Sequence, residues 1–277
     1  MKKHLSTIIL VLILTLGLSL ILYPTIADWW NSMHQSYAIS NYESVMANMS
    51  DEDYTHLFDA AMEYNQRLRQ INFPLMYYDE VEGYYDLLNI TGNGIMGYIA
   101  IPKIDVKLPI YHGTSGAVLQ IAVGHLEGSS LPTGGEGNHC VLSAHRGLPS
   151  ARLFTDLDKM EEGDIFTLNV VDRVLTYQVD QILIVEPSDV EPLYAEAGQD
   201  YCTLITCTPY GINSHRMLVR GTRIENIEEE KVIRVTADAA QIEPLMVAPI
   251  VAAPILLVLL ILVLVPKSKK KRKGNQQ

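Results

Sequence analysis

The stretch TLITCTPYGINSHRMLVRG (residues 203–221) has the pattern of two short strands joined by a turn-rich loop. Both ends are rich in apolar and β-branched residues, whereas the middle contains Pro209, Gly211 and Asn213, which favour turns. If the two strands pair as a hairpin, Cys207 at the end of the first lies beside Arg216 at the start of the second. The hairpin therefore predicts a thiol and a guanidinium side by side at one end of a sheet.

Short runs of the same kind precede this hairpin along the chain. They are rich in Val, Ile, Thr and Tyr, and Gly, Pro, Asn and Asp lie between them, which predicts a mainly β fold, an all-β barrel or sandwich, over residues 97–225. One run ends at His145, so a barrel could gather this imidazole on the same rim as Cys207 and Arg216. The runs are GYIAIPKI, KLPIYHG, HCVLSAH, DIFTLNV and RVLTYQVDQILIVEP.

A helical lead-in is predicted before the barrel. Residues 28–70 carry apolar side chains at helical spacing, and Ser50 followed by Asp53 resembles a capping box at the start of a helix. Residues 72–88 contain Pro74 and many tyrosines and are predicted to form an irregular loop or flap.

Two uncharged apolar runs, residues 5–23 and 245–265, each have about the 20 residues that a membrane-spanning helix needs. The first could instead be a cleaved signal peptide. Its apolar run is longer than a usual signal core, however, and the following PTIADWW is a poor cleavage site, so we favour a retained anchor. The second run contains Pro249 and Pro254, which membrane helices tolerate.

Basic residues flank both apolar runs on the sides facing the chain ends, at Lys2 and Lys3 and again in residues 267–273. Such residues mark the cytoplasmic side of a membrane, so both termini are predicted to lie in the cytoplasm and the barrel outside the cell. The predicted organisation is an N-terminal anchor (1–23), a helical lead-in with the flap (24–96), a β domain (97–225), a juxtamembrane linker (226–244), a second transmembrane helix (245–265) and a basic cytoplasmic tail (266–277).

The overall charge argues against a nucleic-acid-binding protein. The formal net charge is −11, and the basic residues at the chain ends leave the middle still more acidic. Beside a membrane helix, the Lys/Arg tail is instead expected to contact lipid headgroups. The chain has only three cysteines, without metal-ligand spacing, so no metal or other cofactor is predicted.

Cysteine, histidine and arginine together suit acyl transfer. A free thiol has a pKa near ~8.5, and a neighbouring imidazole can take its proton to give a nucleophilic thiolate. The tetrahedral oxyanion that follows needs a hydrogen-bond donor, which a guanidinium can supply. Spacing alone does not distinguish such a trio from ordinary structural residues.

Residues 203–221 resemble the signature of the sortases, the surface cysteine transpeptidases of Gram-positive bacteria. GNGIMGYIAIPKIDVKLPIYHGTS, AVGHLEGSSLPTGG and HCVLSAHRGLPSARLFTDLDKMEEGD resemble the class C, pilus-assembling branch, and so do the two anchors and the helical lead-in. The resemblance covers roughly residues 60–225. It implies a closed sortase-type β-barrel.

The resemblance also assigns roles and a reaction. Cys207 would be the nucleophile, His145 its proton partner and later the acid for the leaving amine, and Arg216 the group that steadies the oxyanion or substrate carbonyl. The substrate would be a Leu-Pro-x-Thr-Gly-like sorting signal at the C-terminus of a pilin or surface protein, cleaved between Thr and Gly through a thioester. In the pilus-building class the acceptor is a lysine amine of the next pilin.

One stretch departs from the class C pattern. These enzymes often carry a lid with an Asp-Pro-aromatic motif over the cleft, whereas here Phe73 precedes Pro74 and a leucine follows it. We therefore expect a missing or weakened lid, or a plug formed by Phe73, Tyr77 or Tyr78 without an ion pair.

Secondary candidates for substrate binding are Thr206 and Thr208, which flank the nucleophile, and His125, for which a local hydrogen-bond role is the stronger reading. Cys140 and Cys202 lie in apolar strands and are interpreted as structural.

Three other functions stay open. They are an exported cysteine hydrolase that uses water as acceptor, a housekeeping sortase that anchors proteins to the cell wall, and a non-catalytic scaffold that binds sorting signals.

Overall fold

The computed structural model describes residues 2–226. The chain divides into two compact units, one containing Met1–Ile26 and the other Ala27–Glu228, and each is described separately below. The predicted linker, second transmembrane helix and basic tail lie outside the described residues, apart from the first residue of the linker.

The described residues of the first unit form the N-terminal part of helix α1 (Lys2–Met46). Among residues 2–226, α1 is the one helix long and apolar enough to cross a membrane, with a candidate span in Ile9–Met46 and a mean hydropathy of 2.4. Leu10, Leu16 and Ile21 are exposed, as lipid-facing side chains would be. This arrangement agrees with the predicted N-terminal anchor.

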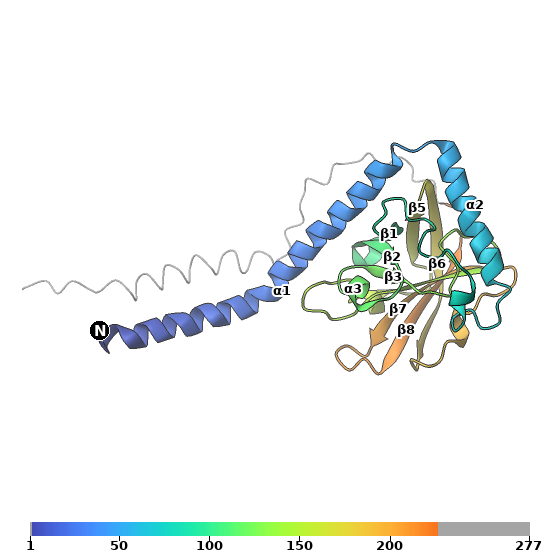
Figure 1. The fold of residues 1–277 in the computed structure, drawn as a ribbon. Coiled ribbons are helices and arrows are strands. Elements are labelled where there is room, and N and C mark those ends of the chain that lie inside the picture. The colour runs from blue at the N-terminus through green and yellow to red at the C-terminus, as the bar shows by residue number, and fades with distance from the viewer. Residues whose placement is uncertain (1, 227–277) are drawn as a thin grey trace, which may run out of the picture. The chain divides into compact units, whose positions relative to one another are not determined.

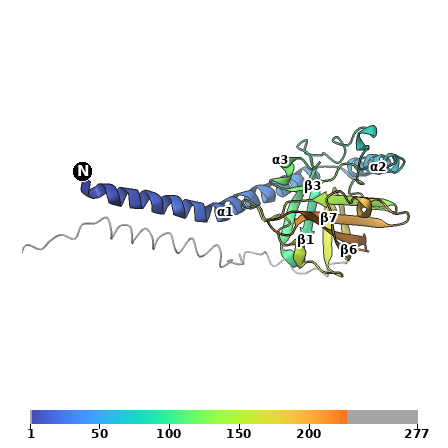
Figure 2. The ribbon, with the colours of Figure 1, turned by 90° about the horizontal axis from the view of Figure 1, so that it is seen from below.

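The second unit is built around a closed β-barrel (Figures 1 and 2). The barrel confirms the mainly β, closed fold expected for residues 97–225, and the strand order around it is β1-β2-β3-β4-β7-β8-β6-β5. The strands are β1 (Ile95–Ile101), β2 (Val106–His112), β3 (Val123–His125), β4 (Asn138–Ser143), β5 (Ile165–Val170), β6 (Arg173–Val185), β7 (Asp200–Thr208) and β8 (His215–Arg223).

Helices cover part of the barrel. The predicted helical stretch is split by a break after Met46, and helix α2 (Asp51–Leu68) then starts with the expected capping box between Ser50 and Asp53. The last turns of α1 are tied to the barrel by Tyr42, whose hydroxyl donates to the Met96 carbonyl and accepts from the Val171 N–H. Short helices are α3 (Gly116–Leu119), η1 (Tyr78–Glu80), η2 (Pro102–Ile104), η3 (Leu157–Lys159) and η4 (Glu191–Leu193).

Two separate sets of buried apolar side chains follow from the alternation of side chains along each strand. Leu142 and Leu204 belong to the main core, together with the apolar face of α2. The neighbouring residues on the same strands point to the opposite face. There Val141, Leu193, Ile205 and Leu218 form a smaller buried cluster, called the outer patch below.

Close backbone approach explains a glycine in β1. An added Cβ at Gly97 would lie 2.3 Å from the carbonyl oxygen of Asn169 on the neighbouring strand β5, which is far inside van der Waals contact. To make room for this Cβ, strand β1 would have to shift, and closely packed cores tolerate such shifts poorly.

We therefore expect Gly97→Ala to lower the free energy of unfolding by roughly 1–3 kcal/mol, measured by chemical denaturation. Gly116→Ala is the matched control, because nothing lies within 4 Å of its added Cβ. Equal stability of the two variants would show that the contact between β1 and β5 is not tight.

Candidate active site

The pairing of three strands brings Cys207 and Arg216 side by side and places His145 just beyond the end of the neighbouring strand. These three residues are called the row below. β7 and β8 are antiparallel neighbours in which Cys207 is the direct partner of Arg216. β4 and β7 run parallel, with Ser143 opposite Ile205, and the Ala144 N–H donates to the Ile205 carbonyl over 3.1 Å. His145 and Cys207 each follow two residues later, so the same register brings them to neighbouring positions.

The side chains of Cys207 and Arg216 also share a face. Residues two apart along a strand point the same way, so Cys207 shares the face of Ile205 and the outer patch. By the same rule Arg216 shares the face of Leu218. Neighbouring strands lie about 5 Å apart, so Cys207 and Arg216 are close enough for one bound carbonyl to meet both groups. His145, Cys207 and Arg216 are each half-buried, which leaves them accessible.

The guanidinium of Arg216 is held by the loop between β7 and β8. Its Nη1 donates to the backbone carbonyls of Asn213 (3.2 Å) and His215 (3.1 Å). A guanidinium has five N–H donors, so these bonds orient the group and leave donors for a substrate oxygen.

The segment that follows His145 is fixed at its backbone. The Phe154 N–H donates to the His145 carbonyl over 3.1 Å, and Gly147, at φ +76°, packs against the ring of Tyr210. The side chain of Arg146 donates to Asp158 and to the Thr208 hydroxyl. These contacts hold the β4–β5 connection against the β7–β8 loop.

Helix α1 also contacts the β4–β5 connection. Asp28 accepts a hydrogen bond from the Arg152 N–H over 2.8 Å, and Asn31 donates to the Ser150 carbonyl over 2.7 Å. The connection that carries His145 is therefore supported from a second side.

The structure does not bring the three secondary substrate-binding candidates to this row. Thr206 is buried, lies on the opposite face from Cys207 and donates to the Ala144 carbonyl. Thr208 is buried on that same opposite face. His125 is fully buried, with Nδ1 2.9 Å from the Tyr84 hydroxyl and Nε2 2.9 Å from the Ser130 carbonyl. The local hydrogen-bond role is therefore the correct reading for His125.

The other two cysteines are structural in their placement. Cys140 and Cys202 are register partners on β4 and β7, and both are buried in the main core. Burial raises the pKa of the Cys202 thiol well above its usual range, so this group stays protonated at neutral pH. Cys207 is the one cysteine of the described residues that is not fully buried.

The start of the flap packs on the barrel through Leu75, which the sequence analysis named only as the residue that follows Pro74. Leu75 contacts the outer patch, and the Pro74 carbonyl would lie 2.4 Å from a Cβ added at Gly128. Phe73, Tyr77 and Tyr78, the predicted plug residues, are 62%, 45% and 37% exposed. The signal in the sequence for this contact was the apolar residue directly after Pro74. It stands where the Asp-Pro-aromatic motif of the class C lid has its aromatic residue.

Known proteins show the same fold and sequence pattern. Residues 99–224 match the profile of the Sortase domain. Sortase A of Streptococcus agalactiae is 32% identical over 41% of this chain and 47% of its own length. Sortase D of Bacillus subtilis is 30% identical over 46% of this chain and 63% of its own length. The chain thus spans about half the length of the curated relatives it matches.

Solved structures are matched more completely. Sortase C1 from Streptococcus agalactiae is 48% identical, with 69% of this chain and 100% of that chain covered at a TM-score of 0.64. Sortase C from Streptococcus pneumoniae is 44% identical, with coverages of 69% and 97% and a TM-score of 0.61.

The chain belongs to the sortase family, whose members are cysteine transpeptidases. Within that family its solved neighbours place it among the class C sortases, as its motifs indicated.

At the far end of the outer face, His139 is buried and neutral. Its Nδ1 lies 3.0 Å from the Tyr194 carbonyl and its Nε2 lies 2.7 Å from the Thr203 hydroxyl, so the hydroxyl donates to Nε2 when Nδ1 carries the proton. Burial lowers the pKa of His139, and the bond to Tyr194 offsets this only in part. Arg220 nearby lowers it further, whereas Glu196 and Asp180 raise it.

This lowered pKa predicts a pH-dependent stability. The unfolded state binds the proton more readily, so stability is present above the unfolded pKa of about 6.5 and is lost as the pH falls below it. Between pH 7.5 and 5.5 we expect a larger fall in the melting temperature of the wild type than of His139→Gln, measured by differential scanning calorimetry. An equal or smaller fall in the wild type would contradict a neutral, buried imidazole.

Proposed function

We propose that this chain is a membrane-anchored transpeptidase that joins pilin subunits. It cleaves a Leu-Pro-x-Thr-Gly-like sorting signal between Thr and Gly and transfers the threonyl acyl group to a lysine amine of the next pilin. The single observation that carries this proposal is the row formed by His145, Cys207 and Arg216, each of which is half-buried and accessible.

Each group of the row has a defined role in the reaction. His145 takes the proton of Cys207, and the thiolate attacks the threonyl carbonyl. Arg216, already oriented by two loop carbonyls, donates to the oxyanion that develops on that carbonyl. His145 then protonates the leaving glycyl amine, which leaves the acyl group on sulfur as a thioester. The lysine amine attacks this thioester and releases the free thiol.

The outer patch provides the binding surface for the sorting signal. Ile205 and Leu218 lie two residues before Cys207 and two after Arg216, so they form the next row of the same face. An apolar surface one step from the nucleophile suits the Leu and Pro side chains of the signal, because their burial is favourable.

The pilin acceptor is supported by the class of the relatives. The solved Streptococcus pneumoniae sortase C is described in terms of its pilin substrate specificity. We extend a pilin substrate to this chain, with surface proteins bearing C-terminal sorting signals as a broader substrate class. Helix α1 suits an anchor in the membrane lipids, with the catalytic domain outside the cell and the termini in the cytoplasm.

The flap acts as a lid in this proposal. Leu75 occupies the surface that the signal would use, because it packs directly on the outer patch. The signal and Leu75 therefore compete, and the part of the flap around Leu75 must move before substrate binds.

Cys207→Ala is expected to abolish the thioester and to lower peptide cleavage by at least about 10,000-fold. The full-length protein would be incubated with a Leu-Pro-x-Thr-Gly peptide, with and without a lysine acceptor, and the products followed by mass spectrometry. Cys140→Ala is the matched control and keeps the thioester. A thioester that survives Cys207→Ala would rule out this nucleophile, and release of acid alone in the presence of acceptor would favour a hydrolase.

Leu75→Ser is expected to raise kcat/KM for the peptide by roughly five-fold, because it removes about 1 kcal/mol of apolar contact that holds the flap closed. Met76→Ser is the control, since Met76 is 69% exposed. If both variants behave like the wild type, the segment does not gate the site and the weakened lid expected from the sequence is the better description.

A further inference from the structure

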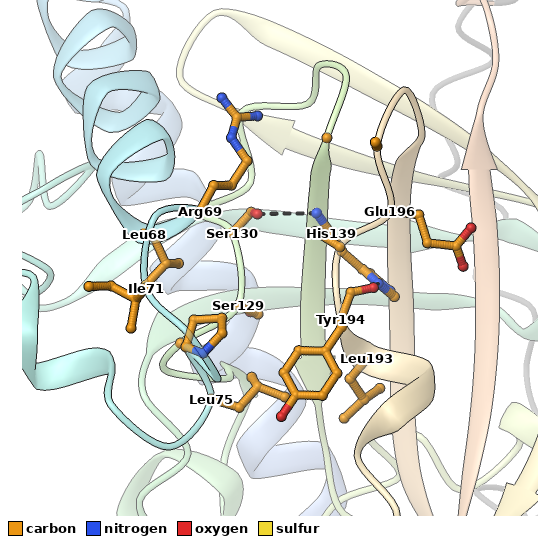
Figure 3. Close-up of a pocket in the computed structure, with 15 residues that line it drawn as sticks. Leu68, Arg69, Ile71, Leu75, Ser129, Ser130, His139, Leu193, Tyr194 and Glu196 are labelled. Atoms are coloured by element: carbon orange, nitrogen blue, oxygen red, sulfur yellow. Dashed lines mark hydrogen bonds between the residues drawn. The ribbon is translucent and has the colours of Figure 1, made fainter.

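A cavity of about 310 Å³ opens beside the flap on the outer face, and Cys207 is not among its lining residues (Figure 3). Four segments surround it. They are the C-terminal end of α2, the flap, the connection between β3 and β4, and the connection between β6 and β7. Of its lining residues, the function proposed above uses only Leu75 and Leu193, the second as a member of the outer patch.

The cavity has a fixed polar floor and apolar walls. His139 and Ser130 are held to each other, because the backbone N–H of His139 donates to the Ser130 hydroxyl over 3.1 Å (Figure 3). Leu68, Ile71 and Leu193 contribute apolar side chains to the walls.

Arg69 and Glu196 also line the cavity, but Arg69 donates to the Glu136 carbonyl and to Asn138, and Glu196 lies 3.7 Å from the guanidinium of Arg220. Because both charges already have partners, the remaining space suits an apolar side chain.

Leu75 connects the cavity with the catalytic row. It lines the cavity and at the same time packs on the outer patch, whose members Ile205 and Leu218 lie next to Cys207 and Arg216. Movement of Leu75 would therefore join the cavity and the outer patch into one continuous groove that leads to the thiol.

The length of this groove can be estimated from strand geometry. His139 precedes His145 by six positions on the same chain segment, which corresponds to about 20 Å of extended strand. An extended peptide covers that distance in about six residues. Counted back from the threonyl carbonyl at Cys207, the leucine of the signal is the fourth residue. The cavity thus lies at the second or third residue before the leucine.

We propose that this cavity is a subsite for apolar side chains located two to three residues before the leucine of the sorting signal. The inference rests on the proposed function and extends it, since it makes the region before the signal a determinant of which pilin is selected. The β6–β7 connection forms one wall of this subsite through Leu193 and Tyr194.

The test compares two peptides on the full-length protein. Both contain Leu-Pro-x-Thr-Gly, but one carries Val-Val-Ala before the leucine and the other Gly-Gly-Ala. The ratio of their kcat/KM values isolates the contribution of the upstream side chains. We expect a ratio of about ten in the wild type, because part of the burial energy of the two valines is realised.

Ala195→Trp places a bulky ring in the cavity, because Ala195 lines it from the exposed side. This variant should reduce the ratio to about one and leave the rate with the glycine peptide unchanged. Ser188→Trp is the matched control on the same connection, is exposed and does not line the cavity. It should keep the ratio of about ten.

A ratio near one in the wild type, or a ratio of ten that persists in Ala195→Trp, would overturn the subsite. Failure of the proposed function gives a different result, namely no turnover of either peptide. In that case, binding of the two fluorescently labelled peptides to Cys207→Ala is measured by anisotropy. The two affinities then show whether the subsite exists. A preference for the valine peptide that Ala195→Trp removes supports the subsite, and equal affinities refute it.

Discussion

The register of β4, β7 and β8 is the constraint on which the rest of the site depends. Parallel pairing of β4 with β7 and antiparallel pairing of β7 with β8 bring His145, Cys207 and Arg216 to one row, although they come from segments far apart in the sequence. A slip of one residue in either pairing would turn one member of the row to the opposite face of the sheet. The buried side chains on both faces of these strands oppose such a slip, because each face contributes to an apolar cluster.

The same alternation separates the structural residues from those available to a substrate. Thr206, Cys202 and Leu204 point to one face and are buried, whereas Cys207 and Ile205 point to the other. The outer face is therefore both a packing surface for the flap and a surface that leads to the nucleophile. In the proposed function, this dual use lets the start of the flap cover the site through Leu75. The contact of Leu75 with the outer patch is apolar and has a modest free energy, so substrate binding can displace it.

Much of this arrangement could be predicted from the sequence, because the strands have regular patterns and clear turns. The hairpin around Cys207 and Arg216 and the capping box at Ser50 were both foreseen and are present. Strand β3 was missed, since a strand of three residues carries too little periodicity. The side on which His125 and the flanking threonines lie could not be inferred, because that depends on which face of the barrel is covered. The contact of Leu75 depends on tertiary packing and likewise has no local signal beyond its position after Pro74.

The geometry of the acyl-enzyme decides whether Cys207, His145 and Arg216 act together on the threonyl carbonyl. The most direct measurement is a crystal structure of the protein with a sorting-signal mimic linked to Cys207. The account predicts that the threonyl carbonyl oxygen lies at hydrogen-bond distance, about 3 Å, from the guanidinium of Arg216, with the imidazole of His145 beside the sulfur and the leucine of the mimic on Ile205 and Leu218. A mimic whose carbonyl oxygen points away from Arg216, or whose chain lies on the opposite face of the sheet, would contradict it.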